Sequence, residues 1–253
     1  MENKFKYIMD NCEKCKGKGY LFNISVDKNK ELKTTADECE CHKKMVQNCR
    51  LDKANVPIEY YNLDFKNDFM DKSGTIKKDI DKVLNNINDF YRKGQCLYLH
   101  GTNGNGKTFA AVEILKKACM EGYSIYYDWF PVIIDLYTKK GYKAYDEQRE
   151  YDEIIEKADF LVVDELGKES ENGAYTKSDI CRFLEINILK KRSSKVTIIV
   201  SNLFGDIKTL GTNYSQSILS VMDHRFHPIH FQGTDYRRGT GKTQANVFFQ
   251  ENN

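Results

Sequence analysis

The feature that most constrains the fold of this chain is a glycine-rich loop between an apolar, strand-like run and a helix-like run. Residues 101–108 read Gly-Thr-Asn-Gly-Asn-Gly-Lys-Thr, a complete Gly-x-x-x-x-Gly-Lys-Thr sequence, and they follow the apolar residues 96–99. Such a loop turns its backbone N–H groups toward phosphate oxygens at a helix N-terminus, and it needs this strand-to-helix context to do so. The sequence therefore predicts a nucleoside triphosphate site.

Two residues of this loop have predicted chemical roles. Lys107 would contact the β- and γ-phosphates, and the Thr108 hydroxyl would ligate Mg²⁺. We therefore expect the chain to bind ATP and Mg²⁺. The expected nucleotide-binding residues of the loop are Gly101, Thr102, Asn103, Gly104, Asn105, Gly106, Lys107 and Thr108.

Strand-like and helix-like segments alternate through the rest of the chain. Strands alternating with helices, with apolar side chains on both strand faces, indicate an α/β fold: a parallel sheet flanked by helices, as in P-loop NTPases. Strands are expected at 96–100, 124–129, 159–164, 196–202 and 229–232. Helices are expected at 76–94, 109–121, 131–140, 146–157, 177–192 and 215–226.

Cysteines cluster near the N-terminus, and in a chain without a secretory signal such a cluster indicates metal or redox chemistry. Cys12-x-x-Cys15 and Cys39-x-Cys41 form two close pairs separated by a hairpin-sized insert. This spacing suits a tetrahedral Zn²⁺ site with two ligands from each pair. The second pair is tighter than the common spacing, so either His42 or Cys49 remains an alternative to one of its cysteines.

These features divide the chain into four parts. Residues 1–50 form the predicted zinc-binding module, which is too short to bury a sufficient core without a metal. Residues 51–75 have no sustained period and are expected to be a linker; 76–238 form the ATPase domain and 239–253 a tail. The tail contains Gly-Thr-Gly-Lys-Thr, but no strand precedes it, so we do not expect a second phosphate site there.

Composition excludes some partners. The net charge is +2, so the protein is not a polycation, and any nucleic-acid binding must depend on a local groove. No apolar stretch approaches the length of a membrane span, and the N-terminus lacks the apolar core of a secretory signal. We expect a cytoplasmic protein with no membrane partner.

Further positions would complete the ATP chemistry. Asp164 and Glu165 follow an apolar strand. Asp164 would hold Mg²⁺, and Glu165 would orient and deprotonate the attacking water. Asn202 ends another buried strand and would place its amide near the γ-phosphate. Arg225, at the end of an amphipathic helix, has two interpretations: a cation supplied to the ATP of a neighbouring subunit, or a surface residue favoured by the helix dipole.

The order of these motifs resembles a known family. The phosphate loop is followed by Val-Val-Asp-Glu-Leu-Gly at 162–167, Ile-Ile-Val-Ser-Asn-Leu at 198–203 and Phe-Gln-Gly-Thr-Asp-Tyr-Arg at 231–237. This set resembles the AAA+ ATPases of the DnaC/DnaI helicase-loader group, to which the IstB transposition ATPases are similar. The resemblance covers about 54–238. The cysteine module resembles the zinc-binding N-terminal domain of DnaI-type and phage loaders.

The resemblance implies an AAA+ domain without the usual helical lid, which acts as an oligomer on a DnaB-type replicative helicase. It implies that Asn202 senses the γ-phosphate, that Arg225 acts on the ATP of the neighbour, and that Arg237 fills a second sensing position. The sequence departs from the family at Glu165, where loaders often carry a second Asp.

The resemblance also points to 130–157 as a segment that contacts single-stranded DNA. Aromatic and cationic residues alternate there, as stacking on bases requires. A solvated helix and loop is the alternative interpretation. The candidate DNA-binding residues are Tyr137, Lys139, Lys140, Tyr142, Lys143 and Tyr145.

The resulting hypothesis is an ATP-hydrolysing helicase loader of DNA replication, with the zinc module binding the helicase. One alternative is an IstB-like transposition-targeting ATPase, which the cysteine module argues against. Another is a nucleotide-gated adaptor or inhibitor of the helicase with little turnover.

Overall fold

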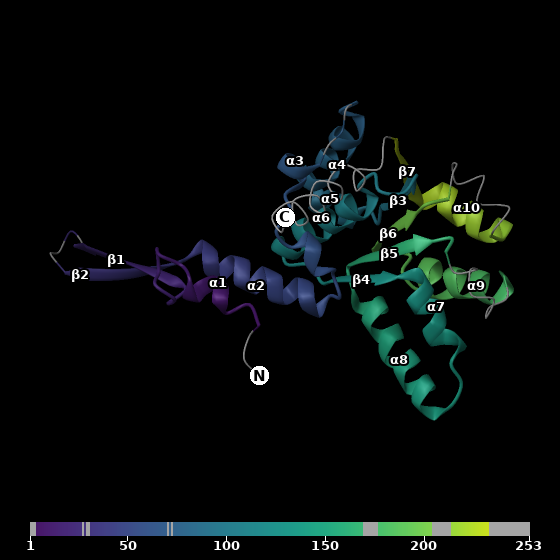
Figure 1. The fold of residues 1–253 in the computed structure, drawn as a ribbon, viewed down its shortest axis with the longest axis horizontal. Helices are drawn as coiled ribbons and strands as arrows, with labels where there is room; N and C mark the ends of the chain where they lie inside the picture. The colour runs from purple at the N-terminus through teal and green to yellow at the C-terminus, as the bar shows by residue number, and fades with distance from the viewer. Residues whose placement is uncertain are drawn as a thin grey trace, which may run out of the picture. The chain divides into compact units, whose positions relative to one another are not determined.

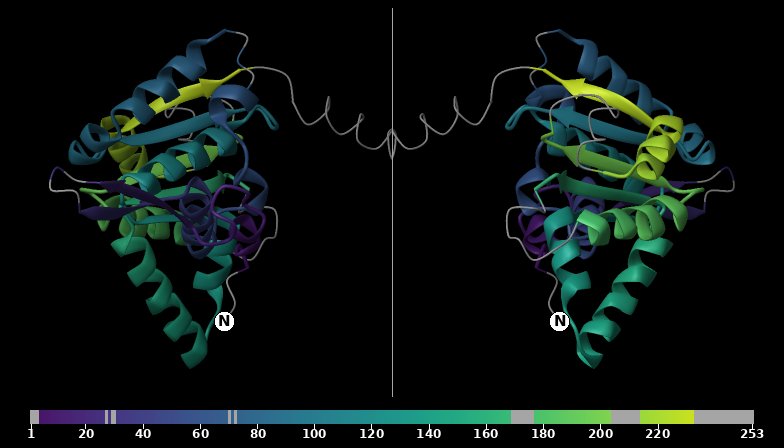
Figure 2. Two further views of the ribbon diagram at one scale, coloured as in Figure 1. Left: turned by 90° about the vertical axis from the view of Figure 1, so that its left-hand side faces the viewer. Right: turned by 90° about the vertical axis from the view of Figure 1, so that its right-hand side faces the viewer.

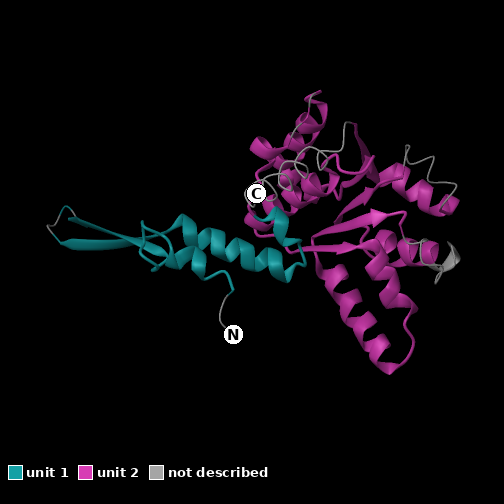
Figure 3. Cartoon of the chain, viewed as in Figure 1, with its two compact units in different colours: residues 1–61 teal, residues 62–253 magenta. Residues whose placement is uncertain are grey.

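A computed structural model describes most of the chain. The residues that it describes are 4–26, 28, 31–69, 71, 73–168, 177–203 and 214–232. Contacts within the chain separate two compact units, residues 1–61 and 62–253 (Figure 3). The division falls within the segment 51–75 that the sequence suggested as a linker.

The first unit consists of a short helix, a β-hairpin and a long helix (Figure 1). The strands of the hairpin are antiparallel, and their register pairs Tyr20 with Glu38 and Val26 with Leu32. Cys39 ends the hairpin and immediately precedes the long helix of the unit. The elements are α1 (Tyr7–Asp10), β1 (Tyr20–Val26), β2 (Leu32–Glu38), α2 (Glu40–Lys53) and the 3₁₀ turn η1 (Ile58–Tyr60).

One face of this hairpin is apolar and exposed. Cross-strand partners in an antiparallel pair lie on the same face, so alternate residues of β1 and the first residue of β2 form one surface. Phe22 is 60% exposed, Ile24 72% and Leu32 76%. Soluble proteins rarely expose a contiguous apolar patch without using it. We call this surface the apolar hairpin face; it consists of Tyr20, Phe22, Ile24, Val26 and Leu32.

The second unit is built on a parallel sheet of five strands. Their spatial order is β4-β5-β6-β3-β7, with every neighbouring pair parallel, so β4 and β7 form the edges (Figure 2). Every residue of β3 and β6 is buried, as expected for strands covered on both faces. The strands are β3 (Cys96–Gly101), β4 (Ile125–Trp129), β5 (Phe160–Leu166), β6 (Val196–Ser201) and β7 (Phe226–Phe231).

Helices cover both faces of the sheet, which confirms the predicted α/β class. Helix α6 contacts the four strands β3, β4, β5 and β6, while side chains on the opposite face join one core cluster with α7, α9 and α10. Tyr98, Val163 and Ile199 are buried members of that cluster. The helices are α3 (Phe65–Asp68), α4 (Thr75–Asn85), α5 (Ile87–Arg92), α6 (Lys107–Met120), α7 (Phe130–Thr138), α8 (Tyr142–Lys157), α9 (Lys177–Phe183), the π-helix η3 (Leu184–Lys190) and α10 (Gln216–Arg225).

Several expected elements differ from the structure: α8 begins at Tyr142 rather than at 146, and the helix expected over 177–192 is divided into α9 and η3. The single helix expected over 76–94 is wrong, because the backbone breaks at Asn86, where φ is −126° and ψ is 32°. The Asn86 side chain donates to the carbonyl of Lys82 at 2.8 Å, which satisfies an acceptor that the break exposes. The last strand begins at Phe226, directly after α10, rather than at 229.

No helix among the described residues combines the length and the apolar character needed to cross a lipid bilayer.

Candidate functional site

The phosphate loop is held by two glycines that accept no side chain. Gly101 has φ of +140°, and a Cβ there would lie 2.2 Å from the carbonyl oxygen of Phe231. Gly106 has φ of +87°, and a Cβ there would lie 2.5 Å from the ring of Phe69. Only glycine meets both the backbone angle and the close approach. The loop is therefore closed tightly between β7 and Phe69, and it leads directly into α6.

The lysine of the loop is buried against the loop itself. Lys107 Nζ donates to the carbonyls of Gly101 at 2.9 Å and Thr102 at 2.6 Å, and to Asn105 Oδ1 at 3.1 Å. Asn105 in turn donates from Nδ2 to the carbonyl of Phe231 at 2.6 Å. The predicted Lys107 therefore lies where backbone N–H groups and one cation can converge on an anion.

The acidic strand end lies beside the loop. Asp164, 3% exposed, accepts from the Thr108 hydroxyl at 2.8 Å and from the Tyr127 hydroxyl at 2.7 Å, both on Oδ2. Its Oδ1 accepts from the backbone N–H of Glu165 at 2.7 Å. Burial raises the pKa of the Asp164 carboxyl, while the Tyr127 and Thr108 hydrogen bonds oppose that rise. A hydroxyl and a carboxylate oxygen in contact are the ligand types that Mg²⁺ prefers, so the pair fits that ion.

Glu165 has an unusual backbone conformation. Its φ is +61°, in the left-handed region that a residue with a side chain rarely adopts. Two residues later, Gly167 has φ of +102°, and a Cβ there would lie 2.6 Å from the side chain of Leu203. The Glu165 carboxylate pairs with Lys168 at 2.8 Å and is about one-third exposed. Strain of this kind gathers at functional sites.

Asn202 directly follows β6, the strand between β5 and β3. The end of β6 is tied to β5 because the Ser201 hydroxyl donates to the carbonyl of Leu166 at 2.7 Å. The carboxyl ends of the three neighbouring strands β5, β6 and β3 therefore bring Thr108, Asp164 and Asn202 to the same end of the sheet. The predicted Arg237 lies outside the described residues.

Arg225 lies at the other end of the sheet. Its guanidinium donates to the carbonyls of Leu189 at 3.0 Å, Arg192 at 3.1 Å and Lys195 at 3.3 Å. One guanidinium nitrogen is 3.5 Å from the sulfur of Cys96, which is the first residue of β3. The phosphate loop lies at the opposite end of this strand, where it follows the last residue of β3. Arg225 is thus remote from the loop of its own subunit, and it anchors the end of η3.

Helices α7 and α8 carry the candidate DNA-binding residues. Tyr142 is 93% exposed and Tyr145 60% exposed, and both lie in the first turn of α8. Tyr137 is packed instead, with its ring 4.4 Å from that of Phe183 and its hydroxyl bonded to Asp152. The cations Lys139, Lys140 and Lys143 lie around the α7–α8 turn, where Lys139 approaches Glu147 at 3.8 Å.

The four predicted zinc ligands form one cluster. The sulfurs of Cys12, Cys15, Cys39 and Cys41 all lie within 4.8 Å of one another. Cys12 and Cys39 are 3.8 Å apart, and Cys15 and Cys41 are 3.3 Å apart, close to the roughly 3.8 Å that tetrahedral Zn–S geometry requires. The donor set therefore fits zinc.

Two further observations support this ligand set. The Cys15 backbone and the Cys41 side chain lower the pKa of Cys12 to about 6, while burial raises the pKa of Cys41, so the cysteines share their protons when no metal is bound. His42 is engaged elsewhere, since its Nδ1 lies 2.6 Å from Glu38. Neither His42 nor Cys49 belongs to the cluster found among the described residues.

Sequence reasoning missed two residues of the nucleotide site. Tyr127 reaches Asp164 from the neighbouring edge strand β4, and Phe69 packs over Gly106. The sequence offers one indication of Tyr127: it is an aromatic residue with a hydroxyl near the end of a predicted strand. That strand precedes the strand that ends in Asp164 and Glu165. Nothing in the local sequence distinguishes Phe69 from other apolar residues.

The parallel sheet, the glycine loop and the Thr108–Asp164 contact define a P-loop ATPase fold of the AAA+ class. The sequence model of the family described as "IstB-like ATP binding protein" matches residues 30–245. The chain belongs to that family. Among curated proteins, none matches the sequence significantly.

Solved structures share the fold. The crystal structure of the DnaC helicase loader is 20% identical with a TM-score of 0.52, over 70% of this chain and 100% of that one. That of DnaI is 22% identical with a TM-score of 0.53, over 72% and 94%. The replication initiator DnaA bound to AMPPCP and single-stranded DNA is 15% identical with a TM-score of 0.51, over 70% and 51%. The predicted resemblance is confirmed at the level of family and fold.

Proposed function

We propose that this protein is an ATP-hydrolysing helicase loader. In this proposal the AAA+ domain self-associates, holds single-stranded DNA and hydrolyses ATP at subunit interfaces, while the zinc module binds a DnaB-type replicative helicase. The observation that carries the ATPase part is the contact between Thr108 and Asp164 beside the glycine loop. The helicase part is supported by the fold shared with the DnaC helicase loader and DnaI.

The nucleotide site supports hydrolysis as well as binding. Lys107 and the loop N–H groups would hold the β- and γ-phosphates, and Thr108 and Asp164 would hold Mg²⁺, which supplies charge neutralisation on the phosphates. Glu165 would accept a proton from the water that attacks the γ-phosphate in line. The two carboxylates have different partners, since that of Glu165 pairs with Lys168 and that of Asp164 accepts from Thr108 and Tyr127.

Arg225 is the proposed cation from the neighbouring subunit. Its position at the far end of β3 agrees with action on another subunit rather than on its own ATP. The guanidinium also donates to three carbonyls of its own chain. To contact the ATP of a neighbouring subunit, it must break at least one of these hydrogen bonds.

The proposed partner contacts use two exposed surfaces. The apolar hairpin face offers a helicase a mainly apolar surface, so binding there should depend little on salt. Tyr142 and Tyr145 offer bases two exposed rings beside the lysines of the α7–α8 turn. DNA binding there should weaken as salt rises.

The test is reconstitution of the full chain with the hexameric replicative helicase of its host. We expect the chain to retain the helicase on a sizing column in 0.5 M salt, and Ile24→Asp to abolish this retention. Thr35→Asp is the matched control, because Thr35 pairs with Asn23 on the opposite face of the hairpin. A chain that hydrolyses ATP but retains no helicase would overturn the loader function and leave the ATPase intact.

The family match favours a second candidate, a transposition-targeting ATPase. The two functions differ in the nucleic acid that stimulates hydrolysis. A loader responds to single-stranded DNA, whereas a targeting ATPase responds to duplex DNA. Steady-state ATPase rates with each form, at equal nucleotide concentration, separate the two candidates.

A further inference from the structure

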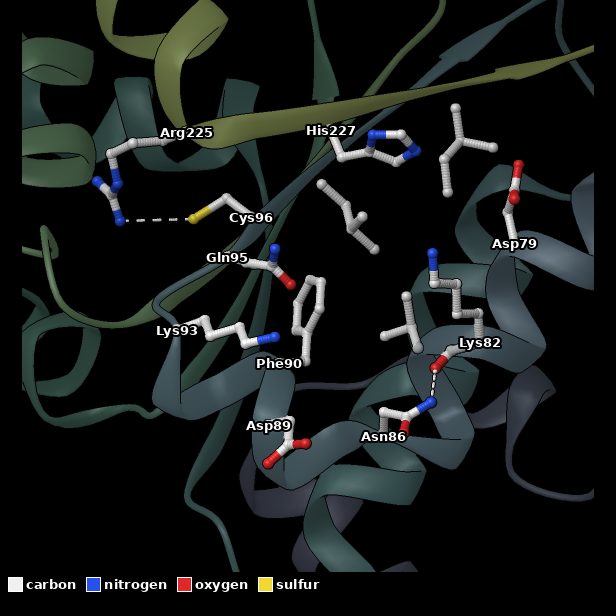
Figure 4. A pocket seen from close by; sticks show the side chains of 13 residues that line it. Asp79, Lys82, Asn86, Asp89, Phe90, Lys93, Gln95, Cys96, Arg225 and His227 are labelled. Atoms are coloured by element: carbon white, nitrogen blue, oxygen red, sulfur yellow. Dashed lines mark hydrogen bonds between the residues drawn. The ribbon is translucent and has the colours of Figure 1, made fainter.

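A pocket of about 410 Å³ opens in the second unit, next to Cys96 at the start of β3 (Figure 4). Its walls come from α4, α5, β3 and β7. Because Cys96 begins β3 and the phosphate loop follows its last residue, the whole strand separates the pocket from the nucleotide site. The two sites are distinct.

The inner wall of the pocket is apolar. Val83 from α4 and Phe90 from α5 face Leu97 from β3 and Ile229 from β7, and all four side chains are buried. The break at Asn86 turns α5 away from α4 and lets both helices contribute to this wall. A volume of this size with an apolar wall is typical of small-molecule sites.

Polar groups surround the opening. The ammonium groups of Lys82 and Lys93 and the side-chain amide of Gln95 have no hydrogen-bond or ion-pair partner among the described residues, and Figure 4 shows all three around the opening, near Phe90. His227 lies above them on β7. Long cationic side chains without partners, gathered at one apolar pocket, are available to an anion.

The charge balance at the rim also limits what can bind. Asp79 and Asp89 line the same pocket, and Asp89 lies 3.5 Å from Arg92. Lys82, Lys93 and Arg225 give a modest positive excess. Two carboxylates at the rim of a small cavity repel an extended polyanion such as DNA, but they leave room for one anionic group beside the lysines.

We propose that this pocket binds a small amphipathic anion. Its apolar body lies against Val83, Phe90, Leu97 and Ile229, and its carboxylate or phosphate group lies between Lys82 and Lys93. Gln95 donates a further hydrogen bond at the opening. The site is separate from the ATP site of its own subunit, because the whole length of β3 lies between them.

Three probes with one apolar body test the proposal on the full chain: 1-naphthoate, 1-naphthyl phosphate and the neutral 1-naphthylmethanol. Binding is measured by calorimetry with saturating ATP and Mg²⁺, so that the phosphate loop is occupied. We expect at least one anion to bind about tenfold or more tightly than the neutral probe. The probe that binds more tightly, 1-naphthoate or 1-naphthyl phosphate, shows whether the anionic group of the ligand is a carboxylate or a phosphate.

Variants then locate the site. Lys82→Met and Lys93→Met keep an apolar stem and should each weaken the anion about tenfold. Lys157→Met, on α8 and outside the pocket, is the control and should leave the affinity unchanged. Gln95→Trp should close the opening and abolish binding without altering ATP affinity. Equal binding of the neutral probe, displacement of the anion by ATP, or unchanged affinity in both lysine variants overturns the proposal.

Discussion

Thr108 Oγ1 and Asp164 Oδ2 share a hydrogen bond of 2.8 Å although the two residues are 56 positions apart in the chain. Thr108 follows the loop after β3, and Asp164 lies near the end of β5, so the bond spans the end of β6 between them. Asn202 follows β6 at that point. The sheet order therefore assembles a site from three motifs that the sequence presents separately.

Tyr127 is expected to position Asp164 for Mg²⁺. Tyr127→Phe removes one of the two hydroxyl donors to Oδ2 and leaves the ring in place. We expect the Mg²⁺ concentration for half-maximal ATPase activity to rise about threefold to tenfold, since a hydrogen bond to a charged group is worth about 1.5–3 kcal/mol when buried, partly offset by rearrangement. Mg²⁺ titrations of the ATPase rate measure this effect.

Tyr126→Phe is the matched control for that experiment. Tyr126 is the preceding residue of β4 and packs with Tyr151 on the opposite face of the sheet from Tyr127. Its variant should keep the parental Mg²⁺ dependence. Equal Mg²⁺ dependence in Tyr127→Phe and the parent would show that Thr108 and the Glu165 backbone N–H position Asp164 without Tyr127.

Glu165 and Arg225 are expected to act on one ATP from two subunits. Glu165→Gln should keep ATP affinity and lower turnover roughly 10²–10⁴-fold, and Arg225→Ala should also lose hydrolysis. A mixture of the two variants should regain activity, because some interfaces pair an intact Glu165 with an intact Arg225. ATPase rates at several mixing ratios measure this complementation.

The fold of Arg225→Ala must be checked in the same experiment, because the guanidinium anchors three carbonyls. Thermal unfolding of the variant provides this check. If the variant is folded and binds ATP but no mixture regains activity, Arg225 acts only within its own chain.

The cysteine cluster is expected to hold about one zinc per chain. Cys12→Ser and Cys41→Ser should each lose the metal and unfold residues 1–61, because a unit of this size depends on its metal. His42→Ala and Cys49→Ser should keep it, since neither side chain lies in the cluster. Elemental analysis with circular dichroism measures both properties. Zinc loss in Cys49→Ser would reassign the fourth ligand.

The sequence predicted those parts of the sites that are encoded by local spacing. The loop at 101–108 and the pair Cys12 and Cys15 each lie within one turn of chain, where spacing and geometry are closely linked. The parallel sheet also followed from the alternation of strand-like and helix-like segments, because parallel strands need helical crossovers, but the spatial order of the strands did not.

Contacts between distant residues were not predictable in this way. Tyr127 meets Asp164 across 37 positions, and Asn105 meets Phe231 across 126. No periodicity encodes such contacts, which depend on sheet order and register. The helix break at Asn86 was missed for a related reason: the apolar spacing of 76–90 continues through it, although a side-chain hydrogen bond to Lys82 stabilises the break.

Asp128 is expected to lower the stability of the protein at neutral pH. Its carboxyl is 5% exposed, and burial raises its pKa to about 6, although the hydrogen bond from the Trp129 backbone N–H and the nearby Tyr151 hydroxyl oppose the rise. The folded pKa thus lies above the unfolded value near 4, so the native state favours the protonated form. Stability therefore falls as pH rises from about 4 to about 6, by roughly 2–3 kcal/mol in total.

Asp128→Asn removes this dependence, because the amide is neutral and still accepts from the Trp129 N–H that now meets Asp128 Oδ1 at 2.8 Å. The variant should be about 2 kcal/mol more stable than the parent at pH 7.5 and nearly equal to it at pH 4. Urea unfolding at both pH values measures the difference. Asp146→Asn, at an exposed position on α8, is the control and should change neither value. A stability gain of the same size at both pH values would mean that packing of the amide, rather than the buried charge, causes the effect.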